Sequence, residues 1–160
     1  MYYEKNPSTA HDIHELRVLL LDTPMTFQTD AGVFSKKMID YGSQVLLKSL
    51  HLEEGKSLLD VGCGYGTIGL TLAKVYHVDT TMIDINNRAL ALAEKNATLN
   101  NVAVDIFQSD IYENVTKQFD YIVSNPPNRD SKAVVHQVIS GAKNHLSENG
   151  TLTIKKKKKQ

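Results

Sequence analysis

The sequence predicts an α/β fold built around a parallel sheet. Between residues 57 and 154, segments with strand composition alternate with segments of helical spacing, a pattern typical of βαβ units. A glycine-rich stretch, GCGYG at residues 62–66, joins the first of these strands to the following helix. The chain has 160 residues, which is the usual size of one domain. We therefore expect a single domain over residues 1–160.

The N-terminal part is expected to add a β-hairpin to this domain. A polar lead-in precedes two apolar segments, residues 15–21 and 25–29, and these flank the turn signal DTP at residues 22–24. We treat residues 1–34 as an N-terminal hairpin extension. Helical spacing of apolar residues then predicts a helix over residues 35–50.

The rest of the chain follows a regular alternation of strands and helices. Short apolar runs bounded by turn residues are interpreted as strands, and longer stretches with helical periodicity are interpreted as helices. Right-handed crossovers should connect the parallel strands. The strands are expected at residues 57–61, 79–83, 102–107, 121–124 and 151–154, and the helices at residues 67–76, 87–99 and 132–145.

Composition indicates a soluble, cytoplasmic protein. Hydrophobic residues make up 41% of the chain, but no apolar run approaches the length of a membrane-spanning helix. The polar N-terminus is unlike a secretory signal peptide. Cys63 has no partner for an internal disulfide, which is typical of a reducing compartment. The six histidines lack metal-ligand spacing, so we expect neither a metal site nor a membrane partner.

The distribution of charge is uneven although the formal net charge is zero. Five of the 18 basic residues form the run 155–159, so the rest of the chain carries 13 basic and 18 acidic residues. We expect residues 155–160 to form a basic tail. The rest lacks the overall basic footprint that nucleic-acid-binding proteins often carry. Any RNA contact must therefore come from a local patch or from the tail.

The glycine-rich stretch and two acidic residues predict a ligand site. In open α/β sheets, ligands bind beyond the carboxyl ends of the strands. Asp60 directly precedes the glycines, where a carboxylate disfavours a pyrophosphate and suits a cation. Asp84 ends the next strand, 24 residues later, a position that suits ribose hydroxyls. Ribose plus a cationic group describes S-adenosylmethionine. NAD remains an alternative ligand, because Gly69 adds a glycine in the following helix. A second alternative is that the glycines only form a tight turn between strand and helix.

A third acidic residue follows the next predicted strand. Asp110 repeats the pattern of an acid beyond a strand end, where it can accept a hydrogen bond from an adenine amino group. Ile85 or Ile111 would then lie against the adenine ring. The alternative for Asp110 is a helix or turn cap.

The stretch SNPP at residues 124–127 ends the fourth predicted parallel strand. This strand should lie beside the first one, so its end faces the ligand site. The Asn125 side-chain oxygen and the Pro126 carbonyl can accept hydrogen bonds from an amine, and the two prolines fix the backbone. Oriented acceptors of this kind suit charge that develops during a reaction at the amine nitrogen. The alternative is an ordinary turn at the end of a strand.

In these motifs the sequence resembles class I S-adenosylmethionine-dependent methyltransferases. The similarity is to the methyltransferase small domain group related to ribosomal small-subunit RNA guanine-N2 methyltransferases, and it covers about residues 13–154. The segments that carry it are residues 27–35 (FQTDAGVFS), 40–43 (DYGS), 59–66 (LDVGCGYG) and 124–127 (SNPP), together with Asp84 and Asp110.

The resemblance implies a Rossmann-like sheet, a cofactor and a set of site residues. It implies that Asn125, Pro126 and Pro127 hold the target amine. It implies that S-adenosylmethionine is bound by the acids and the glycine-rich stretch, with a contribution from Asn125. Thr29, Gly32 and Phe34 would close over the cofactor, with core packing as the alternative for Phe34. The expected cofactor-binding residues are therefore Thr29, Gly32, Phe34, Asp60, Gly62, Cys63, Gly64, Asp84, Ile85, Asp110, Ile111 and Asn125.

The sequence departs from the family pattern at two places. Asn128 follows the prolines where many relatives have an aromatic residue that stacks on the target base. The sheet of the family also continues past its fifth strand, whereas the sequence given leaves room only for the strand order 3-2-1-4-5. The C-terminal strands are therefore expected to be missing, and the lysine run would then discourage pairing at an exposed edge strand.

These observations predict a methyltransferase acting on the exocyclic N2 of a guanine in ribosomal small-subunit RNA. The expected partner is therefore ribosomal RNA or the small ribosomal subunit. Methylation of adenine N6 or of a protein glutamine is an alternative, because the same acceptors serve any planar amine or amide. Two hypotheses of a different class are a non-catalytic RNA-binding module with the same fold and an NAD-dependent oxidoreductase. The sequence does not indicate an oligomeric state.

Overall fold

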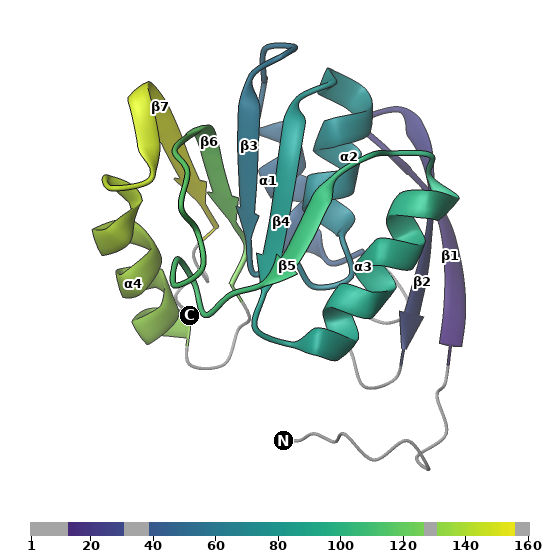
Figure 1. Cartoon of the computed structure of the whole chain (residues 1–160). Coiled ribbons are helices and arrows are strands. Elements are labelled where there is room, and N and C mark those ends of the chain that lie inside the picture. Colours follow the sequence, from purple (N-terminus) through teal and green to yellow (C-terminus); the bar gives the residue numbers. More distant parts are fainter. Residues whose placement is uncertain (1–12, 31–38, 127–130, 156–160) are drawn as a thin grey trace.

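A computed structural model describes residues 13–30, 39–126 and 131–155. Its centre is a five-stranded sheet in the order β5-β4-β3-β6-β7, in which every neighbouring pair is parallel (Figure 1). Counted from the first parallel strand this is the order 3-2-1-4-5, so the predicted α/β class and strand order are confirmed. The strands are β3 (Ser57–Val61), β4 (Asp79–Asp84), β5 (Asp105–Gln108), β6 (Phe119–Ser124) and β7 (Leu146–Ile154).

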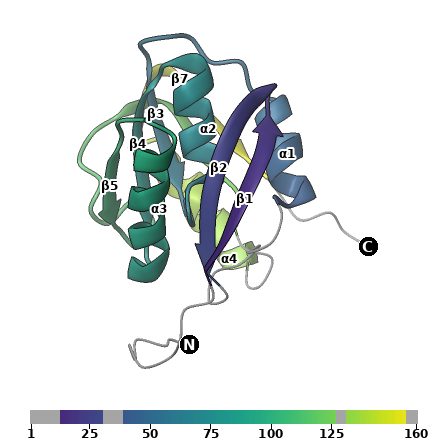
Figure 2. The same ribbon diagram turned by 90° about the vertical axis from the view of Figure 1, so that its right-hand side faces the viewer.

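Helices cover both faces of this sheet, as Figures 1 and 2 show. One face packs against α1 (Tyr41–Lys48), α2 (Thr67–Tyr76), α3 (Asn87–Leu99) and a hairpin, while the other packs against α4 (Ser131–Ala142). Successive residues of a strand point to opposite faces. Leu58 and Leu59 of β3 therefore enter different core clusters, and both are fully buried.

The N-terminal hairpin consists of β1 (Ile13–Leu20) and β2 (Thr23–Asp30), which pair antiparallel. Its turn differs from the prediction, because the two turn residues are Leu21 and Asp22, with φ of 51° and 60°. Two consecutive residues with positive φ match the twist of a two-residue hairpin. Thr23 and Pro24, predicted as turn residues, instead begin β2.

Asn96 of α3 and Asn100, the residue that follows this helix, bind the edge of β2. Asn96 accepts a hydrogen bond from the Gln28 N–H at 2.7 Å and donates to the Gln28 carbonyl at 3.0 Å. It also donates to the Tyr65 carbonyl at 2.8 Å. Asn100 makes the same pair of bonds with Thr26, at 2.9 and 2.7 Å. These buried amides replace a neighbouring strand, and Asn96 connects the hairpin to the glycine-rich stretch.

Other element boundaries also differ from the prediction. α1 begins at Tyr41, because the Asp40 carboxylate caps it by accepting from the Ser43 N–H at 2.7 Å. Residues 35–38 of the predicted helix lie outside the described residues. β5 begins at Asp105 rather than residue 102, and α4 ends at Ala142 rather than residue 145.

β7 begins five residues earlier than predicted. Its pairing with β6 shifts register between Phe119, which faces Leu146, and Tyr121, which faces Thr151. The extra residues form an irregularity that includes Asn149, with φ of 68°. Asn and Gly at residues 149–150 therefore bend β7 within its length rather than opening it.

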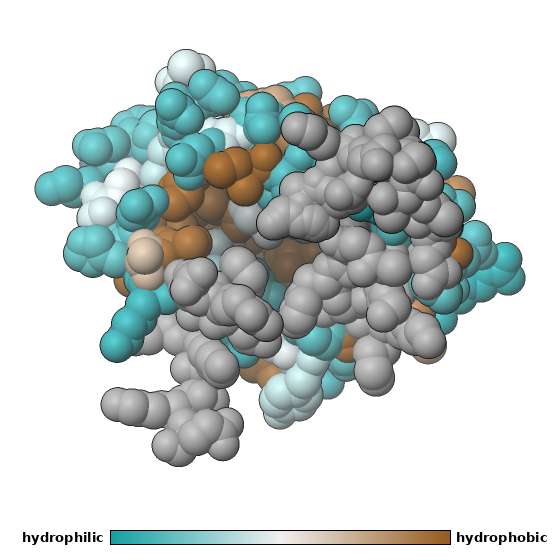
Figure 3. Space-filling view, turned by 90° about the horizontal axis from the view of Figure 1, so that it is seen from below, coloured by the Kyte–Doolittle hydropathy of each residue, from teal (hydrophilic) through white to brown (hydrophobic). Residues whose placement is uncertain are grey.

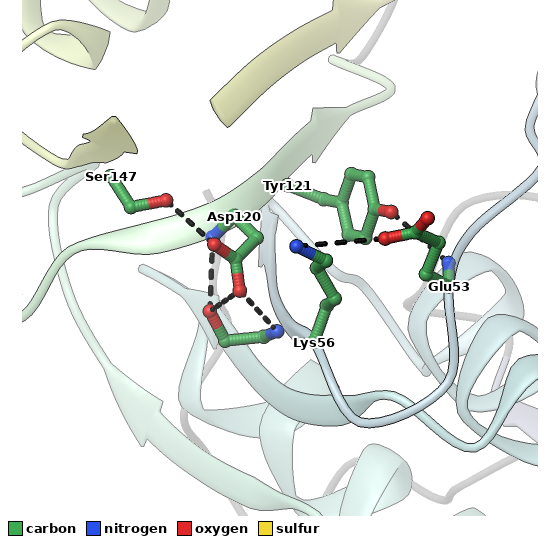
Figure 4. Close-up of polar contacts among 6 residues, drawn as sticks. Glu53, Lys56, Asp120, Tyr121 and Ser147 are labelled. Atoms are coloured by element: carbon green, nitrogen blue, oxygen red, sulfur yellow. Dashed lines mark hydrogen bonds and ion pairs between the residues drawn. The ribbon is translucent and has the colours of Figure 1, made fainter. Parts of the chain in front are cut away.

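A polar cluster fastens three strands at their amino-terminal ends, away from the strand ends where the ligand site is predicted (Figure 4). Asp120 accepts hydrogen bonds from the hydroxyl groups of Ser147 at 2.7 Å and Ser57 at 3.1 Å, and from the Ser57 N–H at 3.0 Å. These bonds hold the pKa of Asp120 below its usual value. Beside it, the Tyr121 hydroxyl accepts from the Glu53 N–H at 3.0 Å. The cluster therefore joins β3, β6 and β7.

No helix among residues 13–30, 39–126 and 131–155 is long and apolar enough to cross a membrane.

The Asn96 contacts predict a large loss of stability on substitution. Asn96→Ala leaves the half-buried Gln28 N–H and the carbonyls of Gln28 and Tyr65 without these partners, so the free energy of unfolding should fall by about 3 kcal/mol. Urea unfolding would measure it. Asn87→Ala, at an exposed position in the first turn of the same helix, serves as the control and should change stability little. A loss below about 1 kcal/mol for Asn96→Ala would contradict the role given to this side chain.

Candidate active site

A cavity of about 560 Å³ lies at the carboxyl ends of β3, β4 and β6. Figure 3 views this end of the sheet, where hydrophobic residues gather around a hollow and hydrophilic residues lie outside them. The volume is in the range of small-molecule sites. Ten residues predicted from the sequence line it, namely Asp60, Gly62, Cys63, Gly64, Asp84, Ile85, Asp110, Ile111, Asn125 and Pro126.

The stretch at residues 62–66 forms the turn between β3 and α2. Gly62, Gly64 and Gly66 have φ of 76°, 58° and 112°, a backbone region that glycine adopts without steric cost. The N–H groups of Gly62 and Cys63 both donate to the Ile83 carbonyl at 2.9 Å. The turn is therefore fastened to the end of β4, and its backbone borders the cavity.

Asp60 is buried in the middle of the sheet, where it is 1% exposed. Its carboxylate accepts a hydrogen bond from the Gly69 N–H at 2.9 Å. Burial raises the pKa of Asp60 to about 7; the bond from Gly69 opposes the rise and the nearby Asp84 adds to it. A Cβ on Gly69 would lie 2.9 Å from the Asp60 oxygen and 2.7 Å from the Met82 sulfur. Close packing against Asp60 and Met82 therefore explains Gly69, which from the sequence alone could also indicate dinucleotide binding.

Asp84 ends β4 beside the glycine turn. One carboxylate oxygen accepts from the Gly64 N–H at 2.8 Å, and the other accepts from the Asn86 N–H at 2.9 Å. Burial raises the pKa of Asp84, and these backbone bonds oppose the rise. Asp84 therefore both holds the turn and presents oxygen lone pairs to the cavity.

Asp110 and two isoleucines border the opposite part of the cavity. Asp110 is exposed and follows the end of β5, and Ile85 is 61% exposed at the rim. Ile111 has a left-handed backbone, with φ of 53°, and its carbonyl accepts from the Ser109 hydroxyl at 2.8 Å. An exposed apolar side chain next to a carboxylate suits a planar ring that carries an amino group.

Asn125 lies where β6 ends and lines the cavity. The side-chain nitrogen donates to the Ser43 hydroxyl of α1 at 2.9 Å. Pro126 follows and also lines the cavity. The predicted residues Pro127, Gly32 and Phe34 lie outside the described residues, as does Asn128. Thr29 is fully buried in β2 and is not among the described residues that line the cavity.

The sequence reasoning missed the cavity residues that come from helices. Asp40 and Ser43 belong to the DYGS segment that carries the family resemblance and form a capping pattern at the start of α1, but neither was predicted as a site residue. Val134 and Gln137 lie one turn apart on α4, with a spacing that any amphipathic helix shows. The missed residues are Asp40, Ser43, Thr67, Ile68, Ala89, Val134 and Gln137.

The charge of the cavity fits a cationic ligand. Among the described residues, its lining includes four carboxylates, those of Asp40, Asp60, Asp84 and Asp110, and no lysine, arginine or histidine. A buried carboxylate is stabilised by a positive charge and destabilised by a negative one. The site therefore suits a positively charged nucleoside such as S-adenosylmethionine and disfavours the pyrophosphate of NAD. Within the described residues, no group of His, Cys, Asp and Glu side chains is arranged to hold a metal ion.

Comparison with known proteins identifies the family. Residues 24–160 match the methyltransferase small domain family. An uncharacterized Bacillus subtilis protein, YbxB, is 42% identical over 164 residues, covering 99% of this chain and 82% of its own. The ribosomal RNA small subunit methyltransferase C of Aeromonas hydrophila is 40% identical over 138 residues, covering 83% of this chain and 40% of its own.

A solved structure shows the same architecture. The T. thermophilus 16S rRNA N2 G1207 methyltransferase, RsmC, in complex with AdoMet and guanosine, superposes with a TM-score of 0.83 at 26% identity. The match covers 95% of this chain and 44% of that one, so the chain spans less than half the length of these two rRNA methyltransferases. The chain belongs to the methyltransferase small domain family and is an S-adenosylmethionine-dependent methyltransferase with a Rossmann-like fold.

Proposed function

We propose that this protein methylates the exocyclic N2 of a guanine in ribosomal small-subunit RNA. The observation that carries the proposal is that one cavity joins a set of carboxylates suited to a cation with an oriented carboxamide at Asn125. Relatives named as rRNA small subunit methyltransferases support the substrate class. The neighbour solved with AdoMet and guanosine supports guanine as the base. Ribosomal RNA as the substrate would place the protein in the cytoplasm.

We propose that residues at the ends of three strands each contact a different part of the cofactor. When bound, S-adenosylmethionine supplies an electrophilic methyl group on a positively charged sulfur. We propose that Asp84 accepts hydrogen bonds from the ribose hydroxyls and that Asp110 accepts from the adenine amino group. Ile85 and Ile111 would then pack on the ring. The turn around Gly62, Cys63 and Gly64 leaves its backbone open to the ligand, and Thr29, Gly32 and Phe34 remain proposed contacts.

Asn125 and Pro126 act on the target amine. The lone pair of a nucleobase amine is delocalised into the ring, which makes the nitrogen a poor nucleophile. The Asn125 oxygen and the Pro126 carbonyl accept hydrogen bonds from the two N–H groups of the amine and hold its nitrogen toward the cavity. Pro127 is proposed to fix the position of these acceptors. Both acceptors stabilise positive charge as it develops on the nitrogen. The amine proton becomes acidic only then and passes to water, so no side chain has to store it.

The candidate substrates are separated by the identity of the methylated molecule. Labelled S-adenosylmethionine is incubated with naked 16S rRNA, with assembled small subunits and with a release-factor protein, and the products are digested. The proposal expects label in N2-methylguanosine. Label in N6-methyladenosine or only in protein would overturn the substrate, and absence of cofactor binding by calorimetry would favour a non-catalytic RNA-binding module.

Asn125→Ala should separate catalysis from cofactor binding. Loss of one oriented polar group lowers turnover by about 10²–10³-fold, whereas the affinity for S-adenosylhomocysteine should stay nearly unchanged. Single-turnover methylation and calorimetry measure the two quantities. Asn144→Ala, at an exposed position after α4, is the control and should match the unchanged protein. Unchanged turnover in Asn125→Ala would remove Asn125 from the mechanism.

Asp60 should make cofactor binding depend on pH. Because burial raises the pKa of Asp60 to about 7, its contribution to stability without ligand is present at acidic pH and is lost as the pH rises toward 7. A bound cation favours the ionised carboxylate and lowers this pKa. Affinity for S-adenosylmethionine should therefore rise with pH up to about 7 and level off above it, with protons released on binding below pH 7.

Calorimetry in two buffers of different ionisation enthalpy measures this proton release directly. Asp60→Asn cannot ionise, so it should bind more weakly and lose most of the pH dependence between pH 5 and 7. Equal proton release in Asp60→Asn and in the unchanged protein would show that another group is responsible.

A further inference from the structure

The Asn125 carboxamide is bound at its nitrogen end. Within the described part of the chain, one hydrogen bond is recorded for this side chain, from its nitrogen to the Ser43 hydroxyl at 2.9 Å. A primary amide has one donor end and one acceptor end. With the nitrogen committed to Ser43, the oxygen is the end presented to the cavity that both residues line.

This choice of orientation matters because an asparagine side chain does not select it alone. Rotation about its last torsion is broad and roughly two-fold, so donor and acceptor ends can exchange positions. A reversed Asn125 would present N–H groups to the N–H groups of a target amine, and the two sets of donors would repel. The structure shows one of these orientations, in which the Ser43 hydroxyl, a group that can both donate and accept, accepts from the amide nitrogen.

Ser43 itself is fixed by the fold. Its side chain is 5% exposed, and its N–H donates to the Asp40 carboxylate that caps α1 at 2.7 Å. One turn further along, Leu46 and Leu47 anchor α1 in the core at 3% and 1% exposure. The position of the Ser43 hydroxyl is therefore set by helix packing before any ligand arrives, which is the condition for a preorganised contact.

The start of α1 is also held from the side of β7. A Cβ on Gly42 would lie 2.6 Å from the Lys155 side chain, so α1 packs closely on the residue that follows β7. The Lys155 N–H in turn donates to the carbonyl of Ser124 at 3.0 Å. Ser124 directly precedes Asn125, so the helix and the strand end that carry the Ser43–Asn125 pair are held together.

We propose that Ser43 is a positioning residue that holds the Asn125 carboxamide with its oxygen toward the target amine. This inference rests on the proposed amine methylation. Ser43 touches neither the cofactor nor the amine in this role and acts through Asn125. Its removal should therefore matter only when Asn125 is present.

A double-mutant cycle tests this dependence. Ser43→Ala should lower kcat about tenfold, the scale of one lost hydrogen bond, with little change in KM for RNA or in affinity for S-adenosylhomocysteine. In the Asn125→Ala background, Ser43→Ala should cause no further loss. Ser49→Ala is the control: it removes the hydroxyl of the exposed residue that follows α1, which donates to the Leu46 carbonyl, and it should keep full activity. Equal losses in both backgrounds, or an unchanged kcat, would overturn the proposal.

A second readout does not require turnover. In ¹⁵N-labelled protein, the side-chain NH₂ signals of Asn125 should exchange with water faster in Ser43→Ala than in the unchanged protein or in Ser49→Ala. Unchanged exchange would overturn the role of Ser43. Failure of the unchanged protein to methylate RNA, combined with faster exchange in Ser43→Ala, would instead contradict the proposed substrate and leave the positioning contact intact.

Discussion

The site is organised around a carboxylate buried in the centre of the sheet. Asp60 accepts a backbone hydrogen bond from Gly69, and burial raises its pKa toward neutrality. Burying an ionised group without a compensating charge is costly, so a positively charged ligand would stabilise the ionised form of Asp60. The same bond requires α2 to approach β3 closely, and Gly69 permits that approach. The hydrogen bond between Gly69 and Asp60 therefore links the packing of α2 on β3 to the carboxylate that favours a cationic ligand.

The main elements were predictable where one signal dominated. β3, α2 and α3 have the expected bounds, because apolar periodicity and flanking glycine or asparagine agree there. The hairpin turn was misplaced because Pro24 looks like a turn residue, yet the left-handed backbone falls on Leu21 and Asp22. The predicted β7 was too short because an irregular segment within a strand has the same composition as a loop. In both cases, residues that favour turns are held in a strand by pairing with the neighbouring strand.

The residues of the candidate site also fall into a group that the sequence predicts and a group that it does not. Asp60, Asp84, Asp110 and Asn125 were predictable because the end of a parallel strand has a fixed place in the sheet. Residues from helices were not, because their distance from the cavity depends on how each helix packs. Ser43 shows the difference, since it lies 82 residues before Asn125 and meets it only after α1 docks. A sequence displays such a residue as a capping pattern and does not reveal its partner.

Three buried or half-buried asparagines show how the fold distinguishes a structural amide from a functional one. Asn96 and Asn100 each use both ends of the carboxamide on the backbone of β2, which leaves them no capacity for a ligand. Among the described residues, half-buried Asn125 is bound at its donor end, by Ser43, and not at its oxygen. An acceptor that borders a cavity can bind a donor from water or from a ligand. Under the proposed function, this open acceptor is the group that binds the target amine.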